Sequence, residues 1–253
     1  MAYIQIKVPQ EVADGIKANR IPQRDLAGLV RNYLSQHATS SQGAVDLQPA
    51  EDGNTNTQNG WIPYFNNFKN PRKRMISAPD VYRIGQNGSQ ELIQSARDDF
   101  DKSWLVSSTR TNYASDTLDA KITHNYGITA VQPVERKVVV PIYQQTALRD
   151  VLKTKEGVDY LQALFDTKDN ADKIAKTLVA LSGKSAEDIY IWAPDQQSRA
   201  GCQERAAGFV FLFGRFHVYG NNRVGDNNGR SRGMTLDSKT YLMKTKQNDI
   251  LPK

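Results

Sequence analysis

GFVFLFGRFHVY, residues 208–219, is the stretch on which the larger part of the fold is expected to depend. Its apolar and aromatic residues are interrupted at Gly214 and Arg215, as in a buried strand or a hairpin of two strands. Two further strands are expected earlier in the chain. KVVVPIY, residues 137–143, is a continuous apolar run that indicates burial on both faces of a sheet. DIYIWAP, residues 188–194, is a strand that ends at a proline.

Helical patterns separate these strands. Residues 89–103 carry apolar side chains on one face of a helix. A second helix is expected over 145–165, with a break near Gly157, and a third over 169–182 that ends at Gly183. Strands separated by helices at this spacing predict an α+β fold, in which a small amino-terminal module precedes a larger mixed α/β domain.

Composition limits the classes of function. The chain has 253 residues, a net charge of +6 and an isoelectric point of about 9.3, which favours a polyanionic partner. Cys202 is the single cysteine, which excludes an intramolecular disulfide and a cysteine-rich metal site. The three histidines, His37, His124 and His217, lack metal-ligand spacing, so neither a metal nor a cofactor is expected. With no membrane-spanning apolar run and no secretory signal, we expect a cytoplasmic protein without a membrane partner.

The first 36 residues have a pattern of their own. YIQIKV, residues 3–8, alternates apolar and polar side chains as a strand does, and Pro9 suits the first turn of a following helix. A second helix from about Pro22 to Gln36 carries an unbroken apolar stripe. Because a strand and two short helices cannot bury both apolar faces alone, we expect two copies to pair through their strands as a symmetric dimer.

The segment IQIKVPQEVADGIKANRIPQRDLAGLVRNYLSQ resembles the ribbon-helix-helix DNA-binding family, in the form with a short first helix found in plasmid-addiction antitoxins. The resemblance covers residues 3–36 and rests on the alternating strand, the proline after it and the pattern of the second helix. It implies that Tyr3, Gln5 and Lys7 read base edges in the major groove. It also implies that backbone amides near Gln23 and Arg24 hold a phosphate. Alternatively, this segment opens a larger domain, with Gln5 and Lys7 facing solvent.

A polar stretch follows this module. Residues 38–60 are rich in Ser, Thr, Gln, Asn and Gly and have no Lys or Arg. Such a composition is typical of a flexible linker, and a compact domain rarely contains so long a structureless connection. We therefore expect three parts: a module over 1–37, a linker over 38–60 and a domain over 61–253.

Two basic segments of the large domain suit a phosphate backbone. WIPYFNNFKNPRKRM, residues 61–75, mixes aromatic and basic residues, a combination that can contact phosphates and stack on bases. Residues 220–234 place arginines in a Gly- and Asn-rich background that can wrap closely around a ligand. In the other interpretation, the aromatic residues pack inwards and the second segment is a solvated hairpin tip. The expected phosphate contacts are Lys69, Arg72, Lys73, Arg74, Arg223, Arg230 and Arg232.

These patterns together predict a DNA-binding regulator or nucleoprotein factor. It would dock through basic loops and read the major groove with its amino-terminal strand. The expected partner is double-stranded DNA, with single-stranded nucleic acid as a second option, and the expected assembly is a homodimer or a higher oligomer. A viral or assembly subunit is another alternative.

An enzyme acting on a nucleic acid or nucleotide is the remaining alternative. Its site would use Arg110, His124, Arg199 and Glu204, which lie near the ends of expected strands. Of these, Arg110 is expected in a polar turn with Thr109 and Tyr113, after a short strand that begins at Trp104. The acidic residues of the helix over 89–103 (Asp98, Asp99 and Asp101) are expected to be solvated rather than to bind a metal.

Overall fold

The computed structural model describes residues 48–49, 55–67, 73–201, 203–225 and 229–235. The chain divides into two units, Met1–Ala44 and Val45–Lys253, and every described residue belongs to the second. Several predictions therefore lie outside the described residues: the module over 3–36 with Tyr3, Gln5, Lys7, Gln23 and Arg24, and the phosphate contacts of Lys69 and Arg72.

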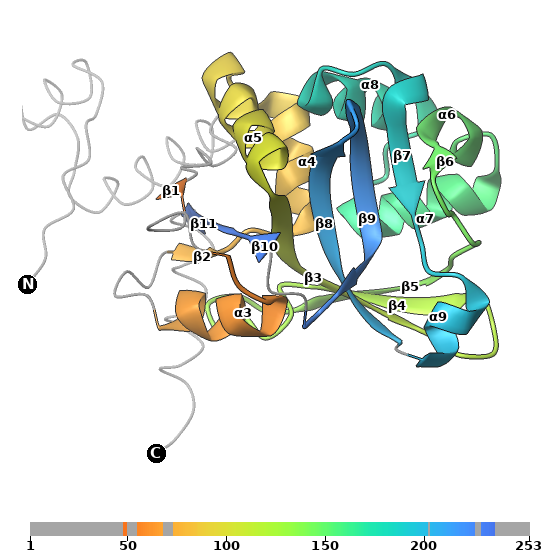
Figure 1. The fold of residues 1–253 in the computed structure, drawn as a ribbon, viewed down its shortest axis with the longest axis horizontal. Coiled ribbons are helices and arrows are strands. Elements are labelled where there is room, and N and C mark those ends of the chain that lie inside the picture. Colours follow the sequence, from red (N-terminus) through yellow and green to blue (C-terminus); the bar gives the residue numbers. More distant parts are fainter. Residues whose placement is uncertain (1–47, 50–54, 68–72, 202, 226–228, 236–253) are drawn as a thin grey trace, which may run out of the picture. The chain divides into compact units, whose positions relative to one another are not determined.

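An eight-stranded sheet forms the centre of the second unit (Figure 1). Its strands lie in the order β5 (Val134–Val139), β4 (Asp119–His124), β3 (Trp104–Tyr113), β8 (Glu204–Leu212), β9 (Arg215–Arg223), β7 (Ile189–Trp192) and β6 (Thr146–Ala147). The short β10 (Gly229–Arg230) pairs with β3. The β7–β9 and β3–β10 pairs are parallel and the other pairs are antiparallel. The predicted mixed α+β class is confirmed.

The hairpin predicted over 208–219 is formed by β8 and β9. Phe213 and Gly214 make the turn with φ angles of 52° and 78°, a left-handed geometry that glycine adopts without strain. Phe209 and Phe216 are fully buried beside Phe100 of helix α5. The hairpin therefore supplies two central strands of the sheet and much of the core behind them.

Five helices of the described residues contribute to the main hydrophobic core: α4 (Ala78–Asn87), α5 (Gln90–Lys102), α6 (Leu148–Val151), α7 (Lys155–Phe165) and α8 (Ala171–Ser182). The helix predicted over 89–103 is α5, and α8 ends as predicted at Gly183, with φ of 68°. The helix predicted over 145–165 is two helices, α6 (Leu148–Val151) and α7. The chain breaks just before Thr154, whose hydroxyl caps α7 by accepting from the Gly157 N–H at 3.1 Å.

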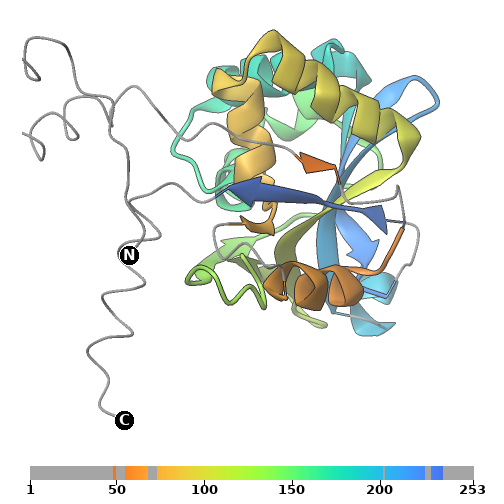
Figure 2. The same cartoon turned by 90° about the vertical axis from the view of Figure 1, so that its left-hand side faces the viewer.

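Helix α3 (Gln58–Asn66) lies on the opposite side of the strands from α5 (Figure 2). Its Trp61, Ile62 and Phe65 form a second, smaller cluster with neighbours that include Met75. Beside it is a three-stranded sheet in the order β1 (Gln48–Pro49), β11 (Arg232–Thr235), β2 (Lys73–Met75). Trp61 and Phe65 thus pack inwards, as the alternative interpretation expected, and Tyr64 is partly buried.

The end of the predicted linker, residues 55–60, belongs to the folded unit. Thr57 caps α3 by accepting from the Gly60 N–H at 2.9 Å. Gln58 is 1% exposed, and its Nε2 donates to the carbonyls of Ser107 and Thr109 at 2.8 Å and 3.0 Å. The expected boundary at Trp61 therefore falls inside a helix, because polar side chains of this stretch make buried hydrogen bonds that composition does not reveal.

Three other expectations are corrected. Thr109, Arg110 and Tyr113 lie in β3 rather than in a turn, because β3 continues through a register shift between Val106 and Arg110. The strand expected over 137–143 to be buried on both faces is instead β5, over Val134–Val139, an edge strand with mostly exposed side chains. The segment 220–234 is no hairpin tip, since it contains the end of β9 as well as β10 and β11.

Two short helical segments complete the described residues: η2 (Ala186–Asp188), a 3-10 turn before β7, and α9 (Gln196–Gly201), before β8. Within the part of the chain that the structure describes, no helix has the length and apolar character needed to cross a membrane.

Candidate functional site

A row of aromatic rings lies on the face of β7 and β9 that points away from the main core. Side chains alternate along each strand, and Ile189 and Ile191 of β7 and Phe216 and Val218 of β9 are fully buried in that core. The residues between them face the other way. The parallel register places Tyr190 beside His217 and Trp192 beside Tyr219. These four rings belong to neither hydrophobic cluster.

The rings contact one another as well as the strands beneath them. The Tyr190 and His217 rings are stacked with centroids 5.6 Å apart, and those of Trp192 and Tyr219 are stacked at 5.0 Å with an interplanar angle of 13°. His217 and Tyr219 on β9 have centroids 5.6 Å apart. Because each ring is held by its neighbours, the array is a preorganised surface rather than a set of free side chains.

Trp104 of β3 extends this surface across a third strand. Its ring meets that of Tyr219 edge to face, with centroids 4.3 Å apart. Strand β8 lies between β3 and β9, and its Gly208 pairs with Tyr219 on one side and Val106 on the other. Since Gly208 has no side chain, the two rings can approach each other over β8. We call the set Trp104, Tyr190, Trp192, His217 and Tyr219 the aromatic face.

A hydrogen bond fixes the centre of the aromatic face. Trp192 Nε1 donates to His217 Nδ1 at 2.9 Å, so the proton of the neutral imidazole is on Nε2. Burial lowers the pKa of His217, and the Leu212 carbonyl partly opposes that shift. His217 is 3% exposed and Tyr219 is 9% exposed, whereas Trp104, Tyr190 and Trp192 remain partly accessible. The three accessible rings therefore pack on the buried rings of His217 and Tyr219, which are held in place.

Positive charge lies at one end of the aromatic face. Arg215 is exposed, and its guanidinium carbon is 4.8 Å from the centre of the Tyr190 ring. Phe213, at the tip of the β8–β9 turn, is 97% exposed but lies beside α5 and the end of α8, so it is not part of the aromatic face. Aromatic rings with a nearby arginine can stack with planar, electron-rich groups such as nucleobases and can contact phosphates.

The aromatic face has to be interpreted from its own chemistry. Comparison with known proteins finds no family model, no curated protein and no solved structure that matches this chain. Within the described residues, no group of histidine, cysteine or acidic side chains is arranged to hold a metal ion.

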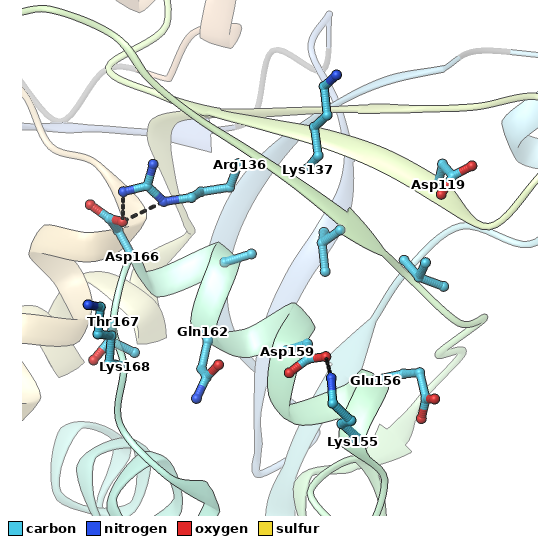
Figure 3. Close-up of a pocket in the computed structure, with 13 residues that line it drawn as sticks. Asp119, Arg136, Lys137, Lys155, Glu156, Asp159, Gln162, Asp166, Thr167 and Lys168 are labelled. Atoms are coloured by element: carbon cyan, nitrogen blue, oxygen red, sulfur yellow. Dashed lines mark hydrogen bonds and ion pairs between the residues drawn. The ribbon is translucent and has the colours of Figure 1, made fainter.

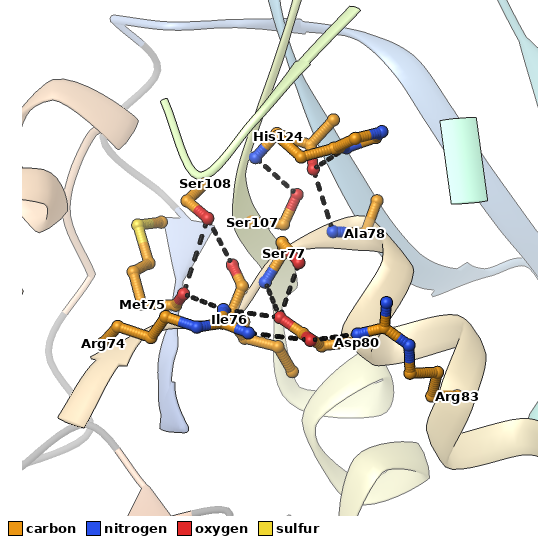
Figure 4. A network of polar contacts seen from close by, with 11 residues as sticks. Arg74, Met75, Ile76, Ser77, Ala78, Asp80, Arg83, Ser107, Ser108 and His124 are labelled. Atoms are coloured by element: carbon orange, nitrogen blue, oxygen red, sulfur yellow. Dashed lines mark hydrogen bonds and ion pairs between the residues drawn. The ribbon is translucent and has the colours of Figure 1, made fainter. Parts of the chain in front are cut away.

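Arg74, a predicted phosphate contact, is held inside the fold by Asp80 (Figure 4). Its Nη1 and Nη2 lie 2.6 Å and 2.9 Å from the two carboxylate oxygens, and Arg83 Nη1 lies 3.0 Å from one of them. Asp80 also accepts from the Ser77 backbone N–H at 2.8 Å. Burial raises the pKa of Asp80, but Arg74, Ser77 and Arg83 outweigh burial and hold that pKa below its usual value. We therefore assign Arg74 a structural role in place of the expected phosphate contact.

Arg232, on β11, is buried in a similar way. It forms an ion pair with Asp99 and donates to Ser95 Oγ at 3.0 Å and to the Ser95 carbonyl at 2.8 Å. Burial lowers the pKa of Arg232 to about 10, against the opposing charge of Asp98. One member of the acidic cluster thus binds an arginine of the same chain, and Arg232 too has a structural role rather than the expected one.

For the other predicted phosphate contacts, the structure gives the strand on which each residue lies. The structure places Lys73 on β2, Arg223 at the end of β9 and Arg230 on β10. Their contacts with phosphates stay predictions.

The four residues of the enzyme alternative are engaged in separate structural contacts. His124 is 1% exposed, with Nδ1 3.1 Å from Thr109 Oγ1 and Nε2 3.0 Å from the Ala163 carbonyl. Burial lowers the pKa of His124, which keeps the imidazole neutral. Arg199 is 1% exposed and donates to three carbonyls, those of Pro194, Thr117 and Val140. Neither side chain is free for catalysis.

Arg110 and Glu204 lie together, but as part of the contact between α3 and the sheet. Arg110 Nε donates to Gln58 Oε1 at 2.8 Å, its Nη2 donates to Asn59 Oδ1, and its Nη1 is 3.3 Å from Glu204 Oε2. The guanidinium carbon lies 3.8 Å from the centre of the Tyr126 ring. Arg110 therefore joins α3 to β3 and β8 rather than forming a site with His124.

The aromatic face was missed in the sequence although a signal for it exists. In IYIW, residues 189–192, and FHVY, residues 216–219, aromatic residues alternate with core residues. This period of two marks a strand with two different faces. Tyrosine and tryptophan are usually counted as apolar. Residues 189–192 then read as a continuous apolar run, which also fits a strand buried on both faces, and the two faces can no longer be told apart.

Proposed function

We propose that this protein binds nucleic acid and that its second unit holds unpaired bases against the aromatic face. The single observation that carries the proposal is the arrangement of five rings from β7, β9 and β3 on one face of the sheet, with Arg215 beside them. Stacking on aromatic side chains contributes about 1–3 kcal/mol per base and tolerates any sequence, since every base has a π face.

Single-stranded nucleic acid suits the aromatic face better than a duplex does. Bases in a duplex are already stacked on one another, so their faces are closed to protein rings, whereas a single strand can turn its bases outward. Arg215 would contact the phosphates, and the net charge of +6 would favour the approach of a polyanion. This is the second of the two partners that the sequence suggested.

The amino-terminal module supplies a different contact in this proposal. The resemblance of residues 3–36 to the ribbon-helix-helix family supports duplex recognition by a dimer, with Tyr3, Gln5 and Lys7 in the major groove. A regulator or nucleoprotein factor of this kind would bind a duplex through one unit and an unpaired strand through the other.

Equilibrium binding tests the proposal. The probe is a fluorescently labelled oligothymidine of about 16 nucleotides, near the upper end of site sizes for single-strand binding folds, followed by anisotropy at several salt concentrations. The expected result is binding that weakens as salt rises and that an unlabelled duplex of unrelated sequence competes for poorly. Absence of binding at low salt, or equal competition by the duplex, would reject the single-strand proposal for the second unit.

A further inference from the structure

The exposed edge of the sheet is a second feature of interest, unrelated to the aromatic face. Strand β5 is the outer strand at one end of the sheet and pairs only with β4 among the described strands. The backbone N–H of Val140 donates to the Leu118 carbonyl at 2.7 Å, so the backbone groups of Val140 point inward, towards the β4 side of the sheet. Inward and outward residues alternate along an antiparallel strand. The N–H and C=O groups of Glu135, Lys137 and Val139 therefore point away from the sheet.

A groove runs beside this edge (Figure 3). It has a volume of about 870 Å³ and is lined by β5 and α7, with Asp119 and the residues that follow α7. Its charged side chains are four acidic (Asp119, Glu156, Asp159 and Asp166) and four basic (Arg136, Lys137, Lys155 and Lys168). Equal numbers of opposite charges do not favour a polyanion. A groove with both positive and negative side chains suits a partner surface that also carries both charges, as the surface of a second copy of this chain does.

The ends of β5 limit what can pair with it. Pro133 and Pro141 flank the strand, and proline has no N–H to donate to a partner strand. Only the residues between the two prolines can therefore pair along this edge. Three apolar side chains are exposed around the Pro141 end: Leu118 by 45%, Val139 by 43% and Ile142 by 46%. An open edge with apolar residues beside it is a site for strand addition.

We infer that β5 pairs antiparallel with β5 of a second copy of the chain, which would join the two sheets into one. Two symmetric registers bring outward backbone groups opposite one another. A register centred on Lys137 would place this lysine against its own copy, which is unfavourable. A register centred on Arg136 places Glu135 opposite Lys137 of the second copy, twice across the interface.

The charges of β5 fit the register centred on Arg136. Lys137 forms no ion pair with another described residue, so its ammonium is available to Glu135 of the second copy. Glu135 is bonded to Lys121 of its own chain at 3.1 Å, and because both side chains are about half exposed, Lys137 of the second copy would join this pair. The two copies of Arg136 would meet at the symmetry axis, but Asp166 already neutralises each of them, with Oδ1 2.6 Å from Arg136 Nη2 and 2.9 Å from Nε. Val134 would then face Val138. This pairing does not depend on the proposed nucleic-acid binding or on the amino-terminal module.

Disulfide cross-linking of the full chain tests this register. In a Cys202→Ser background, Arg136→Cys would place two cysteines opposite each other in a non-hydrogen-bonded pair, where Cα atoms are about 4.5 Å apart, close enough for a disulfide. Mild oxidation at micromolar concentration should give a covalent dimer. Arg149→Cys, at a position whose side chain is 54% exposed on α6, should not. A yield for Arg136→Cys no higher than for Arg149→Cys would overturn the inference.

Two further changes, each made in the Arg136→Cys chain, test whether a cross-link arises from pairing of the two β5 edges or from random collision of two cysteines. Glu135→Pro removes an outward N–H that the pairing with β4 does not use and that would donate to Lys137 of the second copy. The cross-linking yield should therefore fall while the circular dichroism spectrum is kept; Glu135→Thr, which loses the same charge, is the matched control. Lys137→Glu should lower the cross-linking yield about tenfold by setting two like-charge pairs opposite each other, and adding Glu135→Lys should restore it. If the charge reversal had no effect, the register would be wrong.

Discussion

The two faces of the strands β7 and β9 differ in what covers them, although their residues alternate along the same short segments. On one face, Ile191 and Phe216 are fully buried against helices. On the other, Trp192 and His217 lie one residue away and pack against rings of neighbouring strands instead. Burial of one face is enough to hold the sheet, so the second face can keep large aromatic side chains partly accessible. Stability and binding are thus assigned to opposite sides of the same backbone.

The arginines divide in the same way. Arg199 and Arg232 are buried and Arg74 is mostly buried, and all three are bonded to groups of this chain, where they hold loops and helices in place. Arg215, on the aromatic face, is exposed. The comparison predicts that changes on the buried side alter the free energy of unfolding, whereas changes on the aromatic face alter nucleic-acid affinity. The following experiments test whether stability and nucleic-acid affinity depend on these different residues.

The largest effect is expected at Asp80. Asp80→Ala leaves Arg74 buried without its carboxylate, and loss of one partner of a buried pair costs about 3–5 kcal/mol of unfolding free energy. Urea denaturation measures it. Asp101→Ala, at an exposed position, is the control and should change the free energy by less than about 0.5 kcal/mol. Equal effects of the two substitutions would contradict the structural role given to this ion pair.

The same carboxylate predicts how stability depends on pH. Since the pKa of Asp80 in the folded state is lowered from 3.8, its contribution is present above that value. It is lost as the pH falls through the lowered folded-state pKa. Asp80→Asn should therefore flatten the acid side of the stability profile, measured by urea denaturation from pH 7 to the acid limit. If stability fell as steeply with acid in Asp80→Asn as in the parent chain, the loss of stability at low pH would come from groups other than Asp80.

An intermediate effect is expected at Trp192, on binding. Trp192→Ala removes a stacking ring and should weaken single-strand affinity by about 1–3 kcal/mol, or roughly 5- to 150-fold. Trp192→Phe keeps a ring but loses the hydrogen bond to His217, so it should retain most of the affinity. Anisotropy titration of the two variants, with unfolding curves as a check of the fold, decides the matter. Similar losses in both would point to the hydrogen bond rather than to stacking.

The smallest effect is expected at Arg215. Arg215→Ala should weaken binding about two- to fivefold at low salt, because an exposed ion pair, here between the arginine and a phosphate, contributes about 0.5–1 kcal/mol. The loss should shrink as salt rises. Arg149→Ala removes an exposed charge elsewhere and serves as the matched control. If both substitutions weakened binding equally, net charge and not position would explain the affinity.

Much of the fold could be predicted because its signals are local. The hairpin over 208–219 and the end of α8 at Gly183 follow from apolar runs and a glycine that adopts a left-handed conformation. The edge position of β5 could not be predicted, since a run of valines looks the same at an edge as in a centre. The burial of Gln58 depends on carbonyls of a strand some fifty residues away, and no local pattern encodes that contact.

The candidate site was harder to predict for a related reason. Basic residues are visible in a sequence, but whether an arginine meets Asp80 or a phosphate is decided by tertiary contacts. The aromatic face needed the register of β7 against β9, which brings residues 190–192 beside residues 217–219. Parallel pairing of separate segments is set by the whole sheet, so only the structure unites the rings.

The central claim is that the aromatic face binds bases and not only the phosphate backbone. The direct test compares an oligothymidine with an abasic strand of equal length and charge, at the same salt, by isothermal titration. Stacking predicts that the abasic strand binds at least about tenfold more weakly, and that Trp192→Ala narrows this difference. Equal affinity for the two strands would contradict the claim.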